Sequence, residues 1–294
     1  MRKYVIRPWV LRTAALLAFA GISTIYLSGQ QPAAPAPLNI IKLESDLWVI
    51  EGTSNGASDA GNAIIYPTGD GVILVDDRFD ENYAQVMAAV KSVTSEPIKY
   101  VVNTHHHGDH TGGNAKLLAA SVQIAAHANA RKHMVDTQMP GLPQIVFNKE
   151  ASIFLGNKEV RMLYFGRGHT DGDITVYIPA RKTVHLGDLM AGTRGVTNPV
   201  MDYTSGGGIG EWPETLDGTL KLDIDHVVPG HGTPGVKADL LAHRNKVAKI
   251  RSRVRELLGQ KKSKEQLTDV LIAEFDYKPI NLRALDGLMA ELAK

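Results

Sequence analysis

The stretch Asn103-Thr104-His105-His106-His107-Gly108-Asp109-His110 follows an apolar run that is typical of a buried strand. Side chains two residues apart on extended backbone share a side, so His105 and His107 are placed to bind one metal ion. Asp109 and His110 face another direction and are placed to bind a second ion. Clustered imidazole and carboxylate donors at a strand end are hard to explain as core packing, and they predict a metal site.

Further donors occur later in the chain, each beside a glycine and each after a predicted strand. They are His169 in Gly168-His169-Thr170, Asp188 in Gly187-Asp188, and His231 in Gly230-His231-Gly232. These donors complete two sets of imidazole and carboxylate ligands. Such a mixed set suits Zn²⁺, and iron and manganese also accept it.

Hydrophobic patterning predicts strands and helices in alternating order, which places the chain in the α/β class with layered sheets. The predicted strands cover residues 40–43, 47–50, 62–66, 72–75, 98–102, 122–126, 152–155, 160–165, 174–178, 183–186 and 227–228. The predicted helices cover residues 81–93, 116–120, 237–258, 263–275 and 281–293.

The composition of the 294-residue chain excludes several classes of protein. It is 44% hydrophobic and contains no cysteine, which rules out a disulfide framework, cysteine-ligated zinc and a thiol nucleophile. The first 38 residues carry four basic and no acidic side chains, and the rest carries 28 basic and 31 acidic ones. That net charge of −3 on the body argues against nucleic acid as a partner and leaves a small molecule as the expected one.

The beginning of the chain has the pattern of a targeting segment. Basic residues between positions 2 and 12 precede an apolar run over 13–27, which is shorter than the roughly 20 residues that span a bilayer. We expect a signal peptide or N-terminal anchor over residues 1–29, a Pro/Ala linker over 30–37, and one domain over 38–294 with C-terminal helices from about 236. The protein is then periplasmic or extracellular, and an uncleaved segment would tether it to the membrane.

The order His-x-His-x-Asp-His, Gly-His-Thr, Gly-Asp and Pro-Gly-His-Gly resembles the metallo-β-lactamase superfamily of dinuclear metallohydrolases, over roughly residues 38–235. This resemblance implies a four-layer αβ/βα sandwich, here with extra C-terminal helices, and a site for two zinc ions. It implies one metal on His105, His107 and His169, a second on Asp109, His110 and His231, and Asp188 as the bridge between them.

The resemblance also implies a reaction. Water held between two metal ions loses a proton readily and attacks a carbonyl-type substrate, while a metal ion polarises the substrate oxygen. Asp109 is the expected catalytic residue, which orients the nucleophile and accepts its proton.

The substrate class stays open at this stage. β-Lactam opening is one candidate, although Asp188 stands where many lactamases of the family have cysteine and Ala191 where they have lysine. The alternatives are a thioesterase or lactonase similar to hydroxyacylglutathione hydrolase (glyoxalase II), and a phosphodiesterase. Two observations argue against these alternatives. Gly232 follows His231, whereas Glu-Tyr follows the corresponding histidine in glyoxalase II, and residues 189–195 contain no tyrosine, which a lactonase would be expected to have there. The alternative to an enzyme is a protein that binds metal but has no catalytic activity.

A few other side chains are given weaker roles. Asp76 ends a predicted strand, and two roles stay open for it: a hydrogen bond to a metal-binding histidine, or the capping of a turn. His106 alternates with its neighbours and is expected to lie outside the metal ligands. The stretch over residues 190–211, with Arg194, Tyr203 and Trp212 in or beside it, is the candidate for substrate contacts. The oligomeric state cannot be inferred from the sequence.

Overall fold

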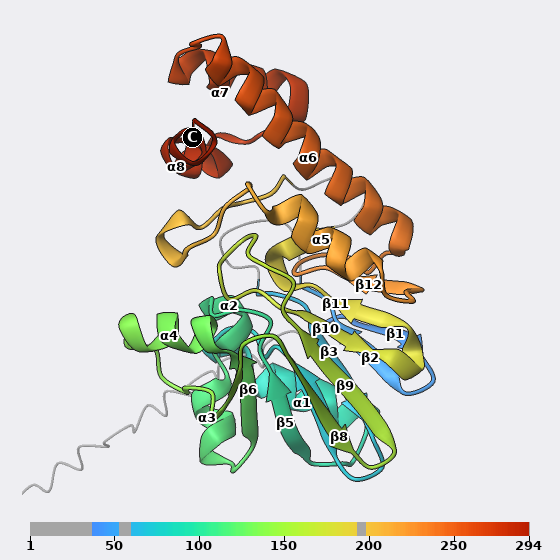
Figure 1. Cartoon of the computed structure of the whole chain (residues 1–294). Coiled ribbons are helices and arrows are strands. Elements are labelled where there is room, and N and C mark those ends of the chain that lie inside the picture. Colours follow the sequence, from blue (N-terminus) through green and yellow to red (C-terminus); the bar gives the residue numbers. More distant parts are fainter. Residues whose placement is uncertain (1–36, 53–59, 193–197, 294) are drawn as a thin grey trace, which may run out of the picture. The chain divides into compact units, whose positions relative to one another are not determined.

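A computed structural model describes residues 37–52, 60–192 and 198–293. These residues form two β-sheets with helices on their outer faces (Figure 1). The predicted segment over residues 1–29, all but the last residue of the predicted linker over 30–37, and Arg194 lie outside the described residues. No helix in the described part of the chain is long and apolar enough to cross a membrane.

The first sheet has seven strands in the order β1-β2-β3-β4-β5-β6-β7, antiparallel up to β4 and parallel beyond it. Its strands are β1 (Ile40–Glu44), β2 (Leu47–Ile50), β3 (Ala63–Pro67), β4 (Val72–Val75), β5 (Ile98–Val102), β6 (Gln123–His127) and β7 (Ile145–Phe147). The second sheet has the order β12-β11-β10-β9-β8. Its strands are β8 (Glu150–Leu155), β9 (Lys158–Leu163), β10 (Thr175–Ile178), β11 (Thr183–His185) and β12 (His226–Val228).

The helices connect and cover these strands. They are α1 (Tyr83–Val93), α2 (Gly108–Thr111), α3 (Asn114–Ala119), α4 (Ala128–Asp136), α5 (Trp212–Leu220), α6 (Lys237–Gly259), α7 (Lys264–Phe275) and α8 (Leu285–Leu292). Short 3₁₀ turns occur at η1 (Asp80–Asn82), η2 (Pro179–Arg181), η3 (Gly187–Met190), η4 (Tyr203–Ser205) and η5 (Pro279–Ala284).

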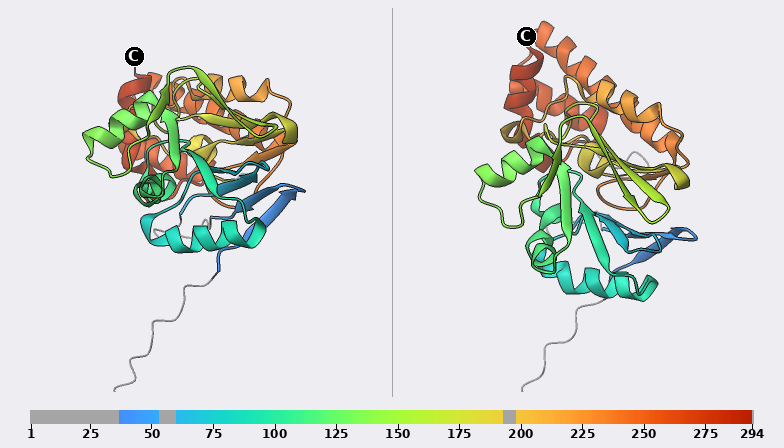
Figure 2. Two further views of the ribbon diagram at one scale, coloured as in Figure 1. Left: turned by 90° about the horizontal axis from the view of Figure 1, so that it is seen from below. Right: turned by 60° about the horizontal axis from the view of Figure 1, so that its bottom comes forward.

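Helices and sheets form four layers, and an apolar cluster lies between each layer and the next. The left view of Figure 2 shows the four layers one above the other. One cluster lies between α1 and the first sheet, where Val86 and Val90 meet Leu74. A second fills the space between the two sheets. The third lies between the second sheet and the C-terminal helices, around Trp212 and Val247. This arrangement confirms the predicted four-layer sandwich and the extra C-terminal helices.

The sequence pattern does not predict α4, α5 or β7. α5 carries Pro213 in its first turn, where proline is tolerated, and Gly218 in its interior, two residue types that are more typical of loops. The helix predicted over residues 281–293 is shorter than expected, because the chain first makes the turn η5 and only then enters α8.

Four strands of the sandwich lead to the predicted donors. β5 of the first sheet leads to His105, while β9, β11 and β12 of the second sheet lead to His169, Asp188 and His231. Because these strands end at the same edge of the two sheets, donors that are distant in sequence come together there.

Candidate metal centre

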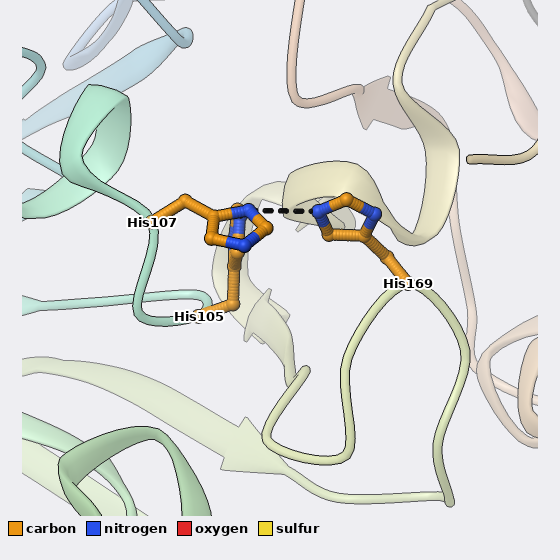
Figure 3. A group of neighbouring side chains, drawn as sticks. All are labelled: His105, His107 and His169. Carbon is orange, nitrogen blue, oxygen red and sulfur yellow. Dashed lines mark hydrogen bonds between the residues drawn. The ribbon is translucent and has the colours of Figure 1, made fainter. Parts of the chain in front are cut away.

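His105, His107 and His169 form the first group of donors at this edge. The Nε2 of His169 lies 2.9 Å from the Nδ1 of His107, and the Nε2 of His105 lies 3.2 Å from the same atom. Figure 3 shows His169 approaching from the opposite side to the other two rings. Three nitrogens within 4.8 Å of one another have the spacing of ligands around one metal ion.

Asp109, His110 and His231 form the second group. The Oδ2 of Asp109 lies 3.3 Å from the Nε2 of His110 and 3.2 Å from the Nε2 of His231. Asp109 and His110 come from the short helix α2, and His231 from the turn after β12. The group therefore joins the first sheet to the second.

Asp188 lies between the two groups. Its Oδ1 is 3.5 Å from the Nε2 of His110 and 3.4 Å from the Nε2 of His231. Its Oδ2 is 3.6 Å from the Nε2 of His169 in the other group. One carboxylate oxygen thus faces each group, which is the arrangement that a bridging ligand requires.

The donor set fits metal ions. The Nε2 of His110 and the Oδ1 of Asp188 are buried and have no hydrogen-bond partner among the described residues. An unpaired buried polar atom is unfavourable in a folded protein unless something binds it. Imidazole and carboxylate ligands around two neighbouring points suit two divalent cations.

The site residues perturb one another's pKa values. Burial opposes the ionisation of Asp188, but the imidazoles of His231 and His110 outweigh it and hold its pKa well below the usual value. Burial likewise opposes the charge on His231, but Asp188 and Asp109 raise its pKa to about 9. The carboxylates are therefore ionised at neutral pH. Metal ions that bind here displace protons from imidazole, so metal affinity should rise with pH.

Asp76 makes the hydrogen bond to a histidine of the site that was one of the two roles open for it. Its Oδ2 lies 2.7 Å from the Nδ1 of His110, and it also accepts from the backbone N–H and the hydroxyl of Thr104. Asp76 is fully buried. It fixes the His110 ring so that the Nε2 faces the site.

The sequence analysis did not predict a role for Asp202. Its carboxylate orients the imidazole ring of His107, a second histidine of the site. Its Oδ2 lies 3.1 Å from the Nε2 of His107, which directs the Nδ1 of His107 toward His169. The same loop presents the backbone carbonyl of Val200, 2.6 Å from the Nδ1 of His169. No local motif marks Asp202, because its partner lies 95 residues away in the chain.

The remaining histidines lie outside the two groups. His106 is buried with its Nε2 3.2 Å from the Oγ of Ser205, in agreement with its predicted place outside the ligands. The others make hydrogen bonds or ion pairs elsewhere: His127 with Asn148, His133 with Asp171, His185 with Asn62, His226 with Glu44, and His243 with Leu189.

The prediction that Trp212 contacts substrate is wrong. Its side chain is fully buried, and its Nε1–H donates to the carbonyl oxygen of Leu189 at 3.1 Å. Trp212 therefore supports the turn that carries Asp188. The hydroxyl of Tyr203 donates to Glu291 at 2.7 Å, so it is also engaged within the protein.

A fold of two face-to-face sheets with His and Asp donors for two metals at one edge defines a class of dinuclear metallohydrolases. The sequence model of the metallo-β-lactamase superfamily matches residues 57–231. The chain belongs to this superfamily, whose members related to it are hydrolases.

Individual relatives agree with this assignment. The chain is 26% identical over 217 residues to a metallo-β-lactamase type 2 of Bacillus cereus, covering 69% of this chain and 80% of that protein. It is 34% identical over 92 residues to a hydroxyacylglutathione hydrolase of Crocosphaera subtropica, covering 31% and 34% of the two proteins. A solved metallo-β-lactamase from Pontibacter korlensis matches 72% of this chain and 99% of its own, with a TM-score of 0.64 and 21% identity.

Proposed function

We propose that this protein is a zinc-dependent hydrolase that opens β-lactams or closely similar cyclic amides. The observation that carries the metal-dependent hydrolase is the position of Asp188, whose two oxygens face separate groups of donors. The similarity to metallo-β-lactamases over more than two thirds of the chain supports the substrate class.

The two groups have distinct roles in this proposal. His105, His107 and His169 would hold one zinc ion, Asp109, His110 and His231 the other, and Asp188 both. Bound zinc supplies a nucleophilic water at neutral pH and a Lewis acid for the substrate oxygen. Around it, Asp76 and Asp202 keep two of the imidazoles oriented.

Asp109 is the proposed catalytic residue. Although burial opposes its ionisation, His110 holds the pKa of Asp109 well below its usual value, so it is a carboxylate at neutral pH. Its Oδ2 faces the centre of the second group and is placed to orient the attacking water and accept a proton from it.

Asp109→Asn should therefore keep the fold and lower kcat about 10²- to 10⁴-fold, the usual contribution of a general base. Steady-state hydrolysis of a chromogenic cephalosporin, with thermal unfolding alongside, tests this. Asp269→Asn, at an exposed position of α7, is the matched control and should behave as wild type. A near-normal rate in Asp109→Asn would contradict the role given to this residue.

Thioester hydrolysis is the second candidate. The 34% identity to a hydroxyacylglutathione hydrolase favours it, together with the carboxylate at position 188 in a chain without cysteine. The two candidates are separated by assaying a chromogenic cephalosporin and a glutathione thioester with the same zinc-loaded protein. Zinc-dependent turnover of the thioester alone would overturn the β-lactam assignment. Binding of two zinc ions with no turnover of these or of lactones and phosphodiesters would favour a non-catalytic protein.

Export is part of the proposal and rests on residues 1–29 alone. We infer that these residues direct the protein to the periplasm or the cell exterior, or anchor it to the membrane. Fractionation of cells and N-terminal sequencing of the mature protein test this. Recovery of the full-length chain in the cytoplasm would contradict it.

A further inference from the structure

The carboxylate of Glu291, on the last helix α8, is surrounded by hydrogen-bond donors. It accepts from the Nη2 of Arg167 at 2.8 Å and from the hydroxyl of Tyr203 at 2.7 Å. It also accepts from the backbone N–H groups of Ile209 at 2.9 Å and Gly210 at 3.0 Å. Its side chain is only 14% exposed. A largely buried carboxylate with four donors is a structured contact and not a chance surface pair.

The facing loop is shaped to admit this carboxylate. A Cβ at Gly208 would lie 2.5 Å from an oxygen of Glu291, and one at Gly210 would lie 2.7 Å from it. Both glycines therefore leave the space that the carboxylate occupies. α6 contributes a further contact, since the Nη1 of Arg251 donates to the carbonyl oxygen of Gly210 at 2.6 Å.

The same loop is bound to the candidate metal centre. The N–H of Asp202 donates to the carbonyl oxygen of His169 at 2.8 Å, and the N–H of Gly208 donates to that of Gly168 at 2.8 Å. Asp202 in turn contacts the Nε2 of His107. Two of the three imidazoles in the first group thus depend on the loop over residues 200–210.

The helices that hold this loop are an addition to the shared fold. The family match ends at residue 231, before α6 begins at Lys237. Figure 1 shows α6, α7 and α8 gathered at one end of the described body. Contacts from them to the site belong to this chain's own extension.

We propose that Glu291 is a positioning residue for the first metal position, formed by His105, His107 and His169. This inference rests on the proposed function, since it requires that the group binds zinc. Glu291 holds the loop over 200–210 in place, and the loop holds Asp202 against His107 and the Val200 carbonyl against His169. Loss of the carboxylate would let these two rings reorient and weaken zinc binding at that position.

Stepwise zinc titration of the full-length protein against a chromophoric chelator tests the inference. In Glu291→Gln, the amide keeps one acceptor oxygen and puts an NH2 group in the place of the other, so the backbone N–H of either Ile209 or Gly210 loses its acceptor. One of the two zinc dissociation constants should rise about 2- to 30-fold while the other stays unchanged. Asp202→Asn, one step closer to the metal, should raise the same constant about 10- to 100-fold.

Two further variants make the result specific. Tyr203→Phe removes a single donor to Glu291 without a charge change, and it should raise the same constant by less than Glu291→Gln does. Glu274→Gln is the matched control, because Glu274 lies on α7 and pairs with Arg253 at the surface. It should leave both constants unchanged.

The outcomes separate this inference from the function on which it rests. If Glu291→Gln raises both zinc dissociation constants equally, or changes neither, the inference is overturned and the hydrolase assignment stays intact. A wild-type protein that binds no zinc would overturn both.

Discussion

Each imidazole of the first group, and His110 of the second, has its other ring nitrogen held within the protein. The Nδ1 of His110 meets Asp76, the Nε2 of His107 meets Asp202, and the Nδ1 of His169 meets the Val200 carbonyl. The Nδ1 of His105 lies 3.1 Å from the hydroxyl of Thr104. Such contacts fix the ring orientation and raise the basicity of the ligating nitrogen. Metal binding by these histidines therefore depends on the hydrogen bonds of the second ring nitrogen as well as on the nitrogen that faces the metal position.

Asp76→Asn tests this at the residue scale. The carboxylate accepts from the backbone N–H of Thr104 through Oδ1 and from His110 through Oδ2. An amide has one acceptor oxygen and cannot serve both, so the His110 ring loses its fixed orientation. We expect zinc affinity at the second position to fall about 10- to 100-fold. Competition titration with a chelator measures it, and an unchanged affinity would contradict the role of Asp76.

At the scale of elements, the site depends on tight turns at the ends of β11 and β12. Gly187, just before Asp188, has a positive φ of 49°, a backbone conformation that glycine adopts without strain. Gly230, just before His231, lies so close to Asp188 that a Cβ there would overlap its Oδ1. The turn after β12 thus places His231 and also makes room for the carboxylate between the two groups.

Gly230→Ala should displace Asp188 and reduce bound zinc below two ions per chain, because the new methyl group takes the place of the Oδ1. Metal analysis after dialysis measures the stoichiometry. Gly259→Ala, at the end of α6 where a Cβ meets open space, is the control and should retain full zinc. A Gly230→Ala protein with two tightly bound zinc ions would contradict the packing described.

At the scale of the whole described molecule, an ion cluster joins the two sheets at the end opposite the metal centre. Asp46, in the turn between β1 and β2, accepts from the Nε of Arg181 at 2.5 Å and from its Nη2 at 2.8 Å, and it also pairs with Lys158. Lys158 begins β9 and Arg181 precedes β11. Both therefore lie where these strands start, and the strands lead from there to the site. Hydrogen bonds from Arg181, with help from Lys158, lower the pKa of Asp46 to about 2.

Asp46→Asn should lower the free energy of unfolding by about 1 kcal/mol at pH 7, a value reduced for the partial exposure of the pair. A carboxylate with a depressed pKa in the folded state stabilises the protein above its unfolded pKa of about 4, and this stabilisation is lost as the pH falls toward 2. Urea unfolding at several pH values should show the difference between wild type and variant shrinking through that window.

Asp136→Asn is the control for this prediction, because Asp136 forms a surface pair with Lys132 within α4. It should show no measurable loss at any pH. A difference between Asp46→Asn and wild type that persists at pH 2 would mean that Asp46 contributes through packing and not through its charge.

The sequence by itself determined the class of fold and the donors of the candidate site. It could do so because those donors sit in short motifs at strand ends, where residue type, glycine neighbours and the preceding apolar run are all local. The hydrogen bond from Asp76 to a histidine of the site was one of two roles that the sequence left open, because Asp76 too ends a strand. The sequence analysis did not predict α5, where Pro213 and Gly218 are residue types more typical of loops.

Only the tertiary structure decided which residues support those donors. Asp202 reaches His107 across 95 residues, and Glu291 reaches Tyr203 across 88, with no motif to mark either contact. Trp212, which the sequence suggested as a substrate contact, is buried beneath the turn that carries Asp188. The physical reason is that a ligand is marked by its own chemistry, whereas a supporting contact exists only when the sheets and the C-terminal helices have packed together.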